Sequence, residues 1–147
     1  MALRDRITED MKTAMRAADK ERLATVRLLL AAIKQREVDE RITLDDGQVL
    51  AVIEKMIKQR REAITQFASG GRSDLVAKES AEIVVLQAYL PAQLTAAELD
   101  ALISEAITAT GAASIKDMGK VMGFVKPKAQ GRTDMGALSA RIKQKLG

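Results

Sequence analysis

Apolar residues recur at three- and four-residue spacing along the first two thirds of the chain, which is the spacing of one helix face. The pattern predicts four long helices, and these cover approximately residues 3–18, 20–40, 45–69 and 73–90. Asp19 and Ser73 are expected to cap the second and fourth helices. Thr43 and Asp46 resemble a capping box before the third, and Pro91 is expected to stop the fourth.

Three shorter apolar patterns follow Pro91. The first starts at a Thr95-x-x-Glu98 capping box and stops at Gly111, and the next two begin at caps near Ser114 and Asp134. No stretch alternates apolar and polar residues over the length of a strand. The sequence therefore predicts an all-α protein. It has an N-terminal domain of longer packed helices over residues 1–92 and a small C-terminal three-helix domain over 95–147.

Composition narrows the chemistry that this chain can perform. Of the 147 residues, 47% are apolar but only 2% are aromatic, so we expect an aliphatic core. Cysteine and histidine are both absent, which excludes thiolate catalysis and removes the usual general base and the commonest metal ligand. We accordingly expect no catalytic residues, no metal and no cofactor.

The chain begins with a sequence that turns polar at once, and its longest apolar run, Ile83 to Leu86, is too short to cross a membrane. These features predict a soluble cytoplasmic protein without a membrane partner. The sequence makes no prediction of an oligomeric state.

Positive charge gathers at the C-terminal end. Residues 1–91 carry 16 basic and 15 acidic side chains, whereas residues 92–147 carry 8 basic and 5 acidic ones, a net charge of +3. From Lys116 onward, eight basic residues face only two acidic ones, a local net of +6. A small basic module of this kind is typical of a surface that contacts phosphates.

The candidate nucleic-acid-binding residues are cations of this module, namely Lys116, Lys120, Lys126, Lys128, Arg132 and Lys143. Lys116 and Lys120 are expected on the sixth helix, and Lys126, Lys128 and Arg132 on a linker that contains Pro127. The alternative is a solvated lysine surface, in which the last lysines complement the dipole of the final helix.

Three further residues of the module have two interpretations each. Gly119 and Gly123 could allow a partner to approach the backbone, but we favour tight packing against another helix. Phe124 could stack on an unpaired base, but we favour packing at the edge of the small core.

Three groups of residues outside the module also have a functional and a structural interpretation. Arg72 and Ser73 could bind an anion at a helix start, although we favour a turn in which Ser73 caps and Arg72 pairs with Glu79 or Glu82. Arg60 and Arg61, with Lys58, form a cationic cluster that is expected to be solvated or to pair along the third helix, with Glu54 and Glu62 as the nearby acids. Glu79 and Glu82 lack the further ligands that a metal site needs.

Several strings, in this order and spacing, resemble the YqeY-like family over essentially the whole chain. They are Arg27 to Lys34 with Glu37, Lys58 to Ala63, Gly71 to Leu75 with Glu79 and Glu82, Tyr89 to Leu94, Met118 to Met122, and Gly131 to Asp134 with Leu138 and Ser139. The resemblance implies an all-α, two-domain protein. The C-terminal part is similar to the tail of the GatB subunit of tRNA-dependent amidotransferases, and related segments are appended to some glutaminyl-tRNA synthetases.

In those larger proteins the matching tail helps to hold tRNA, so the resemblance implies tRNA as a partner, together with a possible protein partner in translation. The family label of carbon–nitrogen ligase with glutamine as amido donor describes the full complex, and no Cys nucleophile or phosphate-binding loop is visible here. The leading hypothesis is a non-catalytic tRNA-binding accessory protein. A protein–protein adaptor is the alternative, and a cryptic amidotransferase ranks third.

Overall fold

The computed structural model describes residues 2–147, which form seven α-helices and one short 3-10 helix, with no strand in that range. The prediction of an all-α fold is confirmed. The chain divides into two compact units, residues 1–90 (unit 1) and 91–147 (unit 2).

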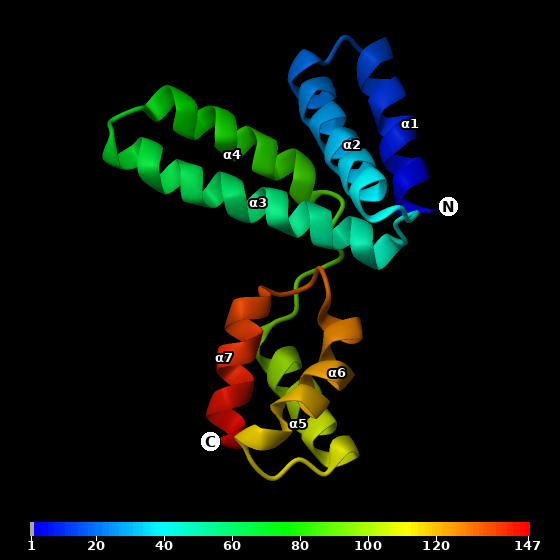
Figure 1. The fold of residues 1–147 in the computed structure, drawn as a ribbon. Helices are drawn as coiled ribbons and strands as arrows, with labels where there is room; N and C mark the ends of the chain where they lie inside the picture. Colours follow the sequence, from blue (N-terminus) through cyan, green and yellow to red (C-terminus); the bar gives the residue numbers. More distant parts are fainter. Residues whose placement is uncertain (1) are drawn as a thin grey trace. The chain divides into compact units, whose positions relative to one another are not determined.

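Unit 1 consists of two helical hairpins (Figure 1). The first pairs α1 (Leu3–Arg16) with α2 (Lys20–Glu40), and the second pairs α3 (Asp46–Ser69) with α4 (Ser73–Gln87). Helix α2 also packs on α3 and α4. The shared core is aliphatic apart from Tyr89, and its fully buried members include Ile7, Leu29, Ile53 and Leu86.

The N-terminal caps of unit 1 only partly follow the sequence pattern. Asp19 accepts a hydrogen bond from the Arg22 amide at 3.2 Å, which confirms it as the cap of α2. The capping box of α3 is formed by Asp45 and Gln48, so the prediction for Thr43 and Asp46 was wrong. Each side chain of this pair accepts the other residue's amide, at 2.8 and 3.0 Å.

An ion-pair network joins the two helices of the second hairpin. The Arg60 Nε of α3 donates to Glu82 Oε2 of α4 at 2.7 Å and lies 3.9 Å from Glu79 Oε2. All three side chains are largely buried. The expected pairings of Arg60 along its own helix, and of Arg72 with Glu79 or Glu82, were therefore wrong, because antiparallel packing of α3 and α4 brings Arg60 to both carboxylates.

Tyr89, at the C-terminal end of unit 1, bonds to the first helix of that unit, α1. Its hydroxyl donates to Asp10 Oδ2 of α1 at 2.7 Å, and the Arg6 guanidinium lies 5.1 Å from the ring centroid. Burial of the ring, together with the Asp10 carboxylate, raises the pKa of Tyr89 far above its ordinary value, so the hydroxyl remains a donor.

Unit 2 is a three-helix arrangement of α5 (Ala96–Thr110), α6 (Met118–Ala129) and α7 (Met135–Leu146), with a 3-10 turn η1 (Ile115–Asp117) leading into α6 (Figure 1). Its core is aliphatic, and the fully buried side chains include Ile103, Val121, Leu138 and Ile142. The buried positions recur at three- and four-residue spacing, which is why these short helices have one apolar face each.

The ends of the unit 2 helices follow the capping signals of the sequence. Thr95 and Glu98 form the capping box of α5, and Gly111 ends that helix with a φ of 67°, a conformation that favours glycine. The Asp134 carboxylate accepts from two amides at the start of α7. These predictions are confirmed, whereas Ser114 caps the turn η1 that leads into α6 and not α6 itself.

Helix α6 extends beyond its predicted end. It runs through Pro127 to Ala129, so Lys126 and Lys128 lie on the helix and not on a linker, as the sequence had suggested. Proline lacks an N–H and therefore removes one helical hydrogen bond, the one to the carbonyl of Gly123. Because Pro127 is exposed and stands only two residues before the end of α6, the helix survives this loss.

Three hydrogen bonds join the start of unit 2 to the connection between α6 and α7. The Leu94 amide donates to the Arg132 carbonyl at 2.8 Å, Arg132 Nε donates to the Ala92 carbonyl at 2.9 Å, and Gln93 Nε2 donates to the Gly131 carbonyl at 3.1 Å. Arg132 therefore holds the chain in place within unit 2.

Candidate nucleic-acid interface

The five candidate lysines are all exposed in the structure. Lys116 lies on η1, Lys120, Lys126 and Lys128 lie on α6, and Lys143 lies on α7. Arg132 differs from them because its side chain is only 35% exposed and bonds to the backbone of Ala92. Its guanidinium therefore already makes a structural hydrogen bond before any ligand binds.

Every acidic side chain of unit 2 either pairs with a cation or caps a helix. Asp100 pairs with Arg141 at 2.7 Å and with Lys145 at 3.8 Å, and Glu105 lies 3.5 Å from Lys128 Nζ. The remaining contacts have N–O distances of 4.0 Å and join Glu98 to Arg132 and Asp117 to Lys120. The fifth acid, Asp134, caps α7.

Three lysines remain without an acidic partner once these pairs are made. Among residues 91–147, all of which the structure describes, these are Lys116, Lys126 and Lys143. They equal in number the net charge of +3 of this part of the chain. An unpaired exposed lysine attracts an anion without first giving up a protein contact, so these three are the strongest phosphate-contact candidates.

Local hydrogen bonds hold two of the acids in their ionised form. The Arg141 guanidinium, with Lys145, keeps the pKa of Asp100 below its ordinary value. The backbone amides of Ala113 and Ser114 lower the pKa of Asp117. Both carboxylates are therefore charged at neutral pH, and the pairs that they make are present there.

The glycines and the phenylalanine of α6 have different surroundings. A Cβ placed at Gly119 or Gly123 would meet nothing within 4 Å, so the expectation of tight helix packing was wrong, because both positions face away from α5 and α7. Phe124 is partly buried against the core of unit 2, which confirms its packing role. Lys128 Nζ lies 4.2 Å from the centroid of its ring.

The other candidate anion site, at Arg72 and Ser73, lacks the side-chain cap that was expected at the start of α4. Ser73 is the first residue of α4 and not its cap, Arg72 occupies the cap position, and no side chain there accepts a backbone amide. Arg72 Nη2 lies 3.1 Å from Asp74 Oδ2, and this contact lowers the pKa of Asp74. The Asp74 carboxylate therefore already pairs with the Arg72 guanidinium that an incoming anion would need. Over residues 2–147, no cluster of three or more potential metal-ligating side chains is found.

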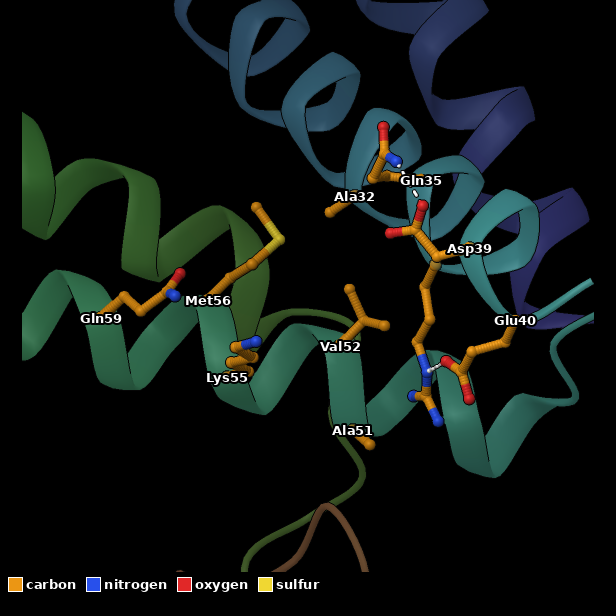
Figure 2. A pocket seen from close by; sticks show the side chains of 10 residues that line it. Ala32, Gln35, Asp39, Glu40, Ala51, Val52, Lys55, Met56 and Gln59 are labelled. Atoms are coloured by element: carbon orange, nitrogen blue, oxygen red, sulfur yellow. Dashed lines mark hydrogen bonds and ion pairs between the residues drawn. The ribbon is translucent and has the colours of Figure 1, made fainter.

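Sequence reasoning missed a groove of about 600 Å³ between α2 and α3 of unit 1. Figure 2 shows Val52 and Met56 on the α3 side, and Gln35 and Asp39 on α2, where Gln35 Nε2 donates to Asp39 Oδ1 at 2.8 Å. Arg36 pairs with Glu40 at 2.5 Å. The polar rim groups are thus largely satisfied by one another, while the floor is apolar.

The comparisons with known proteins identify the family of this chain. The sequence matches the family described as Yqey-like protein over residues 4–146. This chain belongs to the YqeY-like family. Its resemblance to that family, inferred from short strings, is thereby confirmed.

Three curated relatives of this YqeY-like protein come from fungi. A protein of Eremothecium gossypii named altered inheritance of mitochondria protein 41, mitochondrial, is 39% identical over 113 residues, which cover 72% of this chain and 62% of the relative. A protein of the same name from Lachancea thermotolerans is 38% identical over 69% of this chain and 56% of its own length. One from Pyrenophora tritici-repentis is 32% identical and covers 97% of this chain and 80% of its own length.

Two points follow from these relatives. In the first two, the match spans about three fifths of the relative's own length. All three relatives are named as mitochondrial proteins, which contradicts the expected cytoplasmic location. That expectation was wrong because it rested on missing signals, which do not specify a compartment.

None of the helices within residues 2–147 combines the length and apolarity needed to traverse a bilayer.

Proposed function

We propose that this YqeY-like protein is an RNA-binding accessory protein whose unit 2 contacts the phosphates of tRNA. The observation that carries the proposal is the surplus of three exposed lysines, Lys116, Lys126 and Lys143, after every acid of unit 2 has been used. The resemblance of this part of the chain to the GatB tail makes tRNA the first RNA to test. The proposed role is positioning or holding of RNA, without catalysis.

The charge distribution supports RNA backbone recognition more than recognition of a base sequence. Folded RNA is recognised largely by its shape and by its phosphates and ribose hydroxyls. Unit 2 offers cations on η1, α6 and α7, whereas its one aromatic side chain, Phe124, is packed against the core and faces Lys128. Three phosphate contacts predict that the logarithm of the affinity falls with the logarithm of salt with a slope of about −2 to −3.

The proposal is tested with two variants that change net charge equally. One replaces five lysines of unit 2 by Gln, at positions Lys116, Lys120, Lys126, Lys128 and Lys143. The other replaces five exposed lysines of unit 1 by Gln as well, at positions Lys20, Lys34, Lys55, Lys58 and Lys78. Arg132 is left unchanged because it holds the backbone of unit 2.

Filter binding of total tRNA at several salt concentrations then compares both variants with the wild type. We expect the unit 2 variant to lose binding and the unit 1 variant to retain most of it, since non-specific attraction alone would treat them alike. Equal losses in the two variants, or no salt-sensitive binding by the wild type, would contradict the proposal.

The groove of unit 1 favours a second candidate function, an adaptor that binds another protein. Val52 and Met56 line it at 7% exposure each between polar side chains of α2 and α3, and apolar side chains framed by polar ones are usual in protein contacts. This alternative predicts that a partner retained on the immobilised protein stays bound after ribonuclease treatment. It also predicts that both five-lysine variants retain the partner.

A further inference from the structure

The exposed lysines of η1 and α6 fall into two groups. One group belongs to what we call the open flank, which contains Gly119, Gly123 and Lys126 of α6, at intervals of four and three residues, together with Lys116 of η1 just before them. Because an α-helix turns about 100° per residue, these intervals place the three residues of α6 along one side. All four are exposed.

The other flank, which we call the paired flank, contains Lys120, Phe124 and Lys128 at intervals of four residues. Its two lysines have acidic neighbours, since Lys120 lies 4.0 Å from Asp117 and Lys128 lies 3.5 Å from Glu105. Each flank therefore has two lysines, but only those of the open flank lack a carboxylate partner. The formal charge of the two flanks is equal, while their capacity to attract an anion differs.

Between its two lysines the open flank exposes bare backbone. Nothing lies within 4 Å of a Cβ built at Gly119 or Gly123, so packing does not require glycine at either position. Glycine within a helix costs roughly 0.5–1 kcal/mol relative to alanine. Two exposed glycines in a helix of 12 residues thus lower the stability of α6, and no packing contact inside unit 2 compensates for this.

The middle of the open flank also has an unusual acceptor. Pro127 has no N–H, so the carbonyl of Gly123 does not receive the hydrogen bond that a residue four positions later normally donates. Gly123 is exposed and carries no side chain. The Pro127 ring borders this carbonyl, so a hydroxyl donor from outside the helix would reach it from the solvent side, where Gly123 adds no side chain.

We infer that the open flank is the part of unit 2 that contacts RNA, with Lys116 and Lys126 binding phosphates and the backbone at Gly119 and Gly123 lying against the ribose chain. The inference rests on the proposed function and specifies its ligand as a ribose–phosphate backbone. The two lysines are ten residues apart, roughly 15 Å along a helix, so several nucleotides lie between the phosphates that they bind. The carbonyl of Gly123 accepts from a 2′-hydroxyl, the group by which proteins distinguish RNA from DNA.

The first test compares two charge-matched double variants, Lys116→Gln with Lys126→Gln and Lys120→Gln with Lys128→Gln. The probe is total tRNA, measured by filter binding at several salt concentrations. We expect the open-flank variant to bind at least about tenfold more weakly at low salt, with a salt slope reduced by about 1.5–2. We expect the paired-flank variant to change the slope by less than half as much, because its lysines are already partly neutralised.

Equal effects of the two double variants would overturn the open flank as the contact surface. The proposed function would survive that result if the two five-lysine variants still differed from each other. If they did not differ, or if the wild type failed to bind, the proposed function itself would fail, so the two failures are distinguishable.

The second test concerns the glycines. Gly123→Gln places a neutral side chain on the open flank, and Ala140→Gln makes the matched change at an exposed position of α7. We expect Gly123→Gln to lower tRNA affinity at least about tenfold and to reduce the preference for an RNA hairpin over a DNA hairpin of the same sequence, while Ala140→Gln changes neither. Wild-type binding by Gly123→Gln, with the helix shown to be intact by circular dichroism, would overturn the inference.

Discussion

Replacing Gly123 by alanine should stabilise unit 2. The position lies in the interior of α6, it is exposed, and the added methyl group would meet nothing within 4 Å. Glycine pays more backbone entropy on folding than alanine, which is worth about 0.5–1 kcal/mol in a helix interior. No steric cost offsets this gain, so we expect the whole of it to appear as stability.

Amide hydrogen exchange is the appropriate assay because it reports on each unit separately. Amides of α5, α6 and α7 that exchange only through unfolding of unit 2 should exchange up to about fivefold more slowly in Gly123→Ala. Those of α1 to α4 should be unchanged. Gly111→Ala is the matched control, since Gly111 has a φ of 67° and alanine there should cost about 1–2 kcal/mol.

A loss of stability in Gly123→Ala would refute this reasoning, because it would mean that the open flank is covered by something that a methyl group displaces. Equal effects of Gly123→Ala and Gly111→Ala would also refute it, since the two glycines would then not differ in their conformational requirements. The predicted opposite signs separate a glycine that the fold needs from one that it merely tolerates.

Three further predictions concern the stability of each unit. Ile103→Ala removes a fully buried side chain from the core of unit 2 and should cost about 2–5 kcal/mol, so that urea releases the amides of α5 to α7 from protection while those of α1 to α4 remain protected. Glu82→Gln leaves the largely buried Arg60 without its closest carboxylate and should destabilise unit 1 by about 1.5–3 kcal/mol in urea titration at neutral pH, whereas an unchanged midpoint would show that the pair is energetically neutral. The pKa of Asp100 is depressed in the folded state, so the stability that its ionised carboxylate contributes is complete above the ordinary carboxyl pKa and is lost as pH falls through the depressed value. Arg141→Gln should therefore reduce the loss of unit 2 stability below about pH 4. An unaltered profile of stability against pH would contradict the pairing.

The helical architecture could be predicted largely from local signals. Periodicity gave the all-α class, and short-range capping chemistry gave the starts of several helices, because a cap depends on residues two or three positions apart. Thr95 with Glu98, and Asp134, cap the helices that their spacing indicates, while Ser114 caps the turn η1 before α6. Pro127 was misleading because proline breaks a helix only where the lost hydrogen bond and the clash cannot be tolerated, and close to an exposed helix end they can.

The candidate site was predictable in composition but not in its electrostatics. Counting charges locates the basic module, whereas neutralisation of individual lysines depends on how α5 packs against its neighbours. Lys128 and Glu105 are 23 positions apart in sequence, and Arg141 and Asp100 are 41 apart, yet each pair is in contact. The distinction between the open flank and the paired flank of α6 therefore emerges only from the folded structure.

The salt dependence of tRNA binding tests the central claim most directly, namely that the three unpaired lysines of unit 2 contact phosphates. The measurement compares the wild type with the triple variant Lys116→Gln, Lys126→Gln and Lys143→Gln. We predict a slope of about −2 to −3 for the wild type and a slope close to zero for the triple variant, since each lost phosphate contact removes about 0.7–0.9. A triple variant that keeps the wild-type slope would show that these lysines do not contact phosphates.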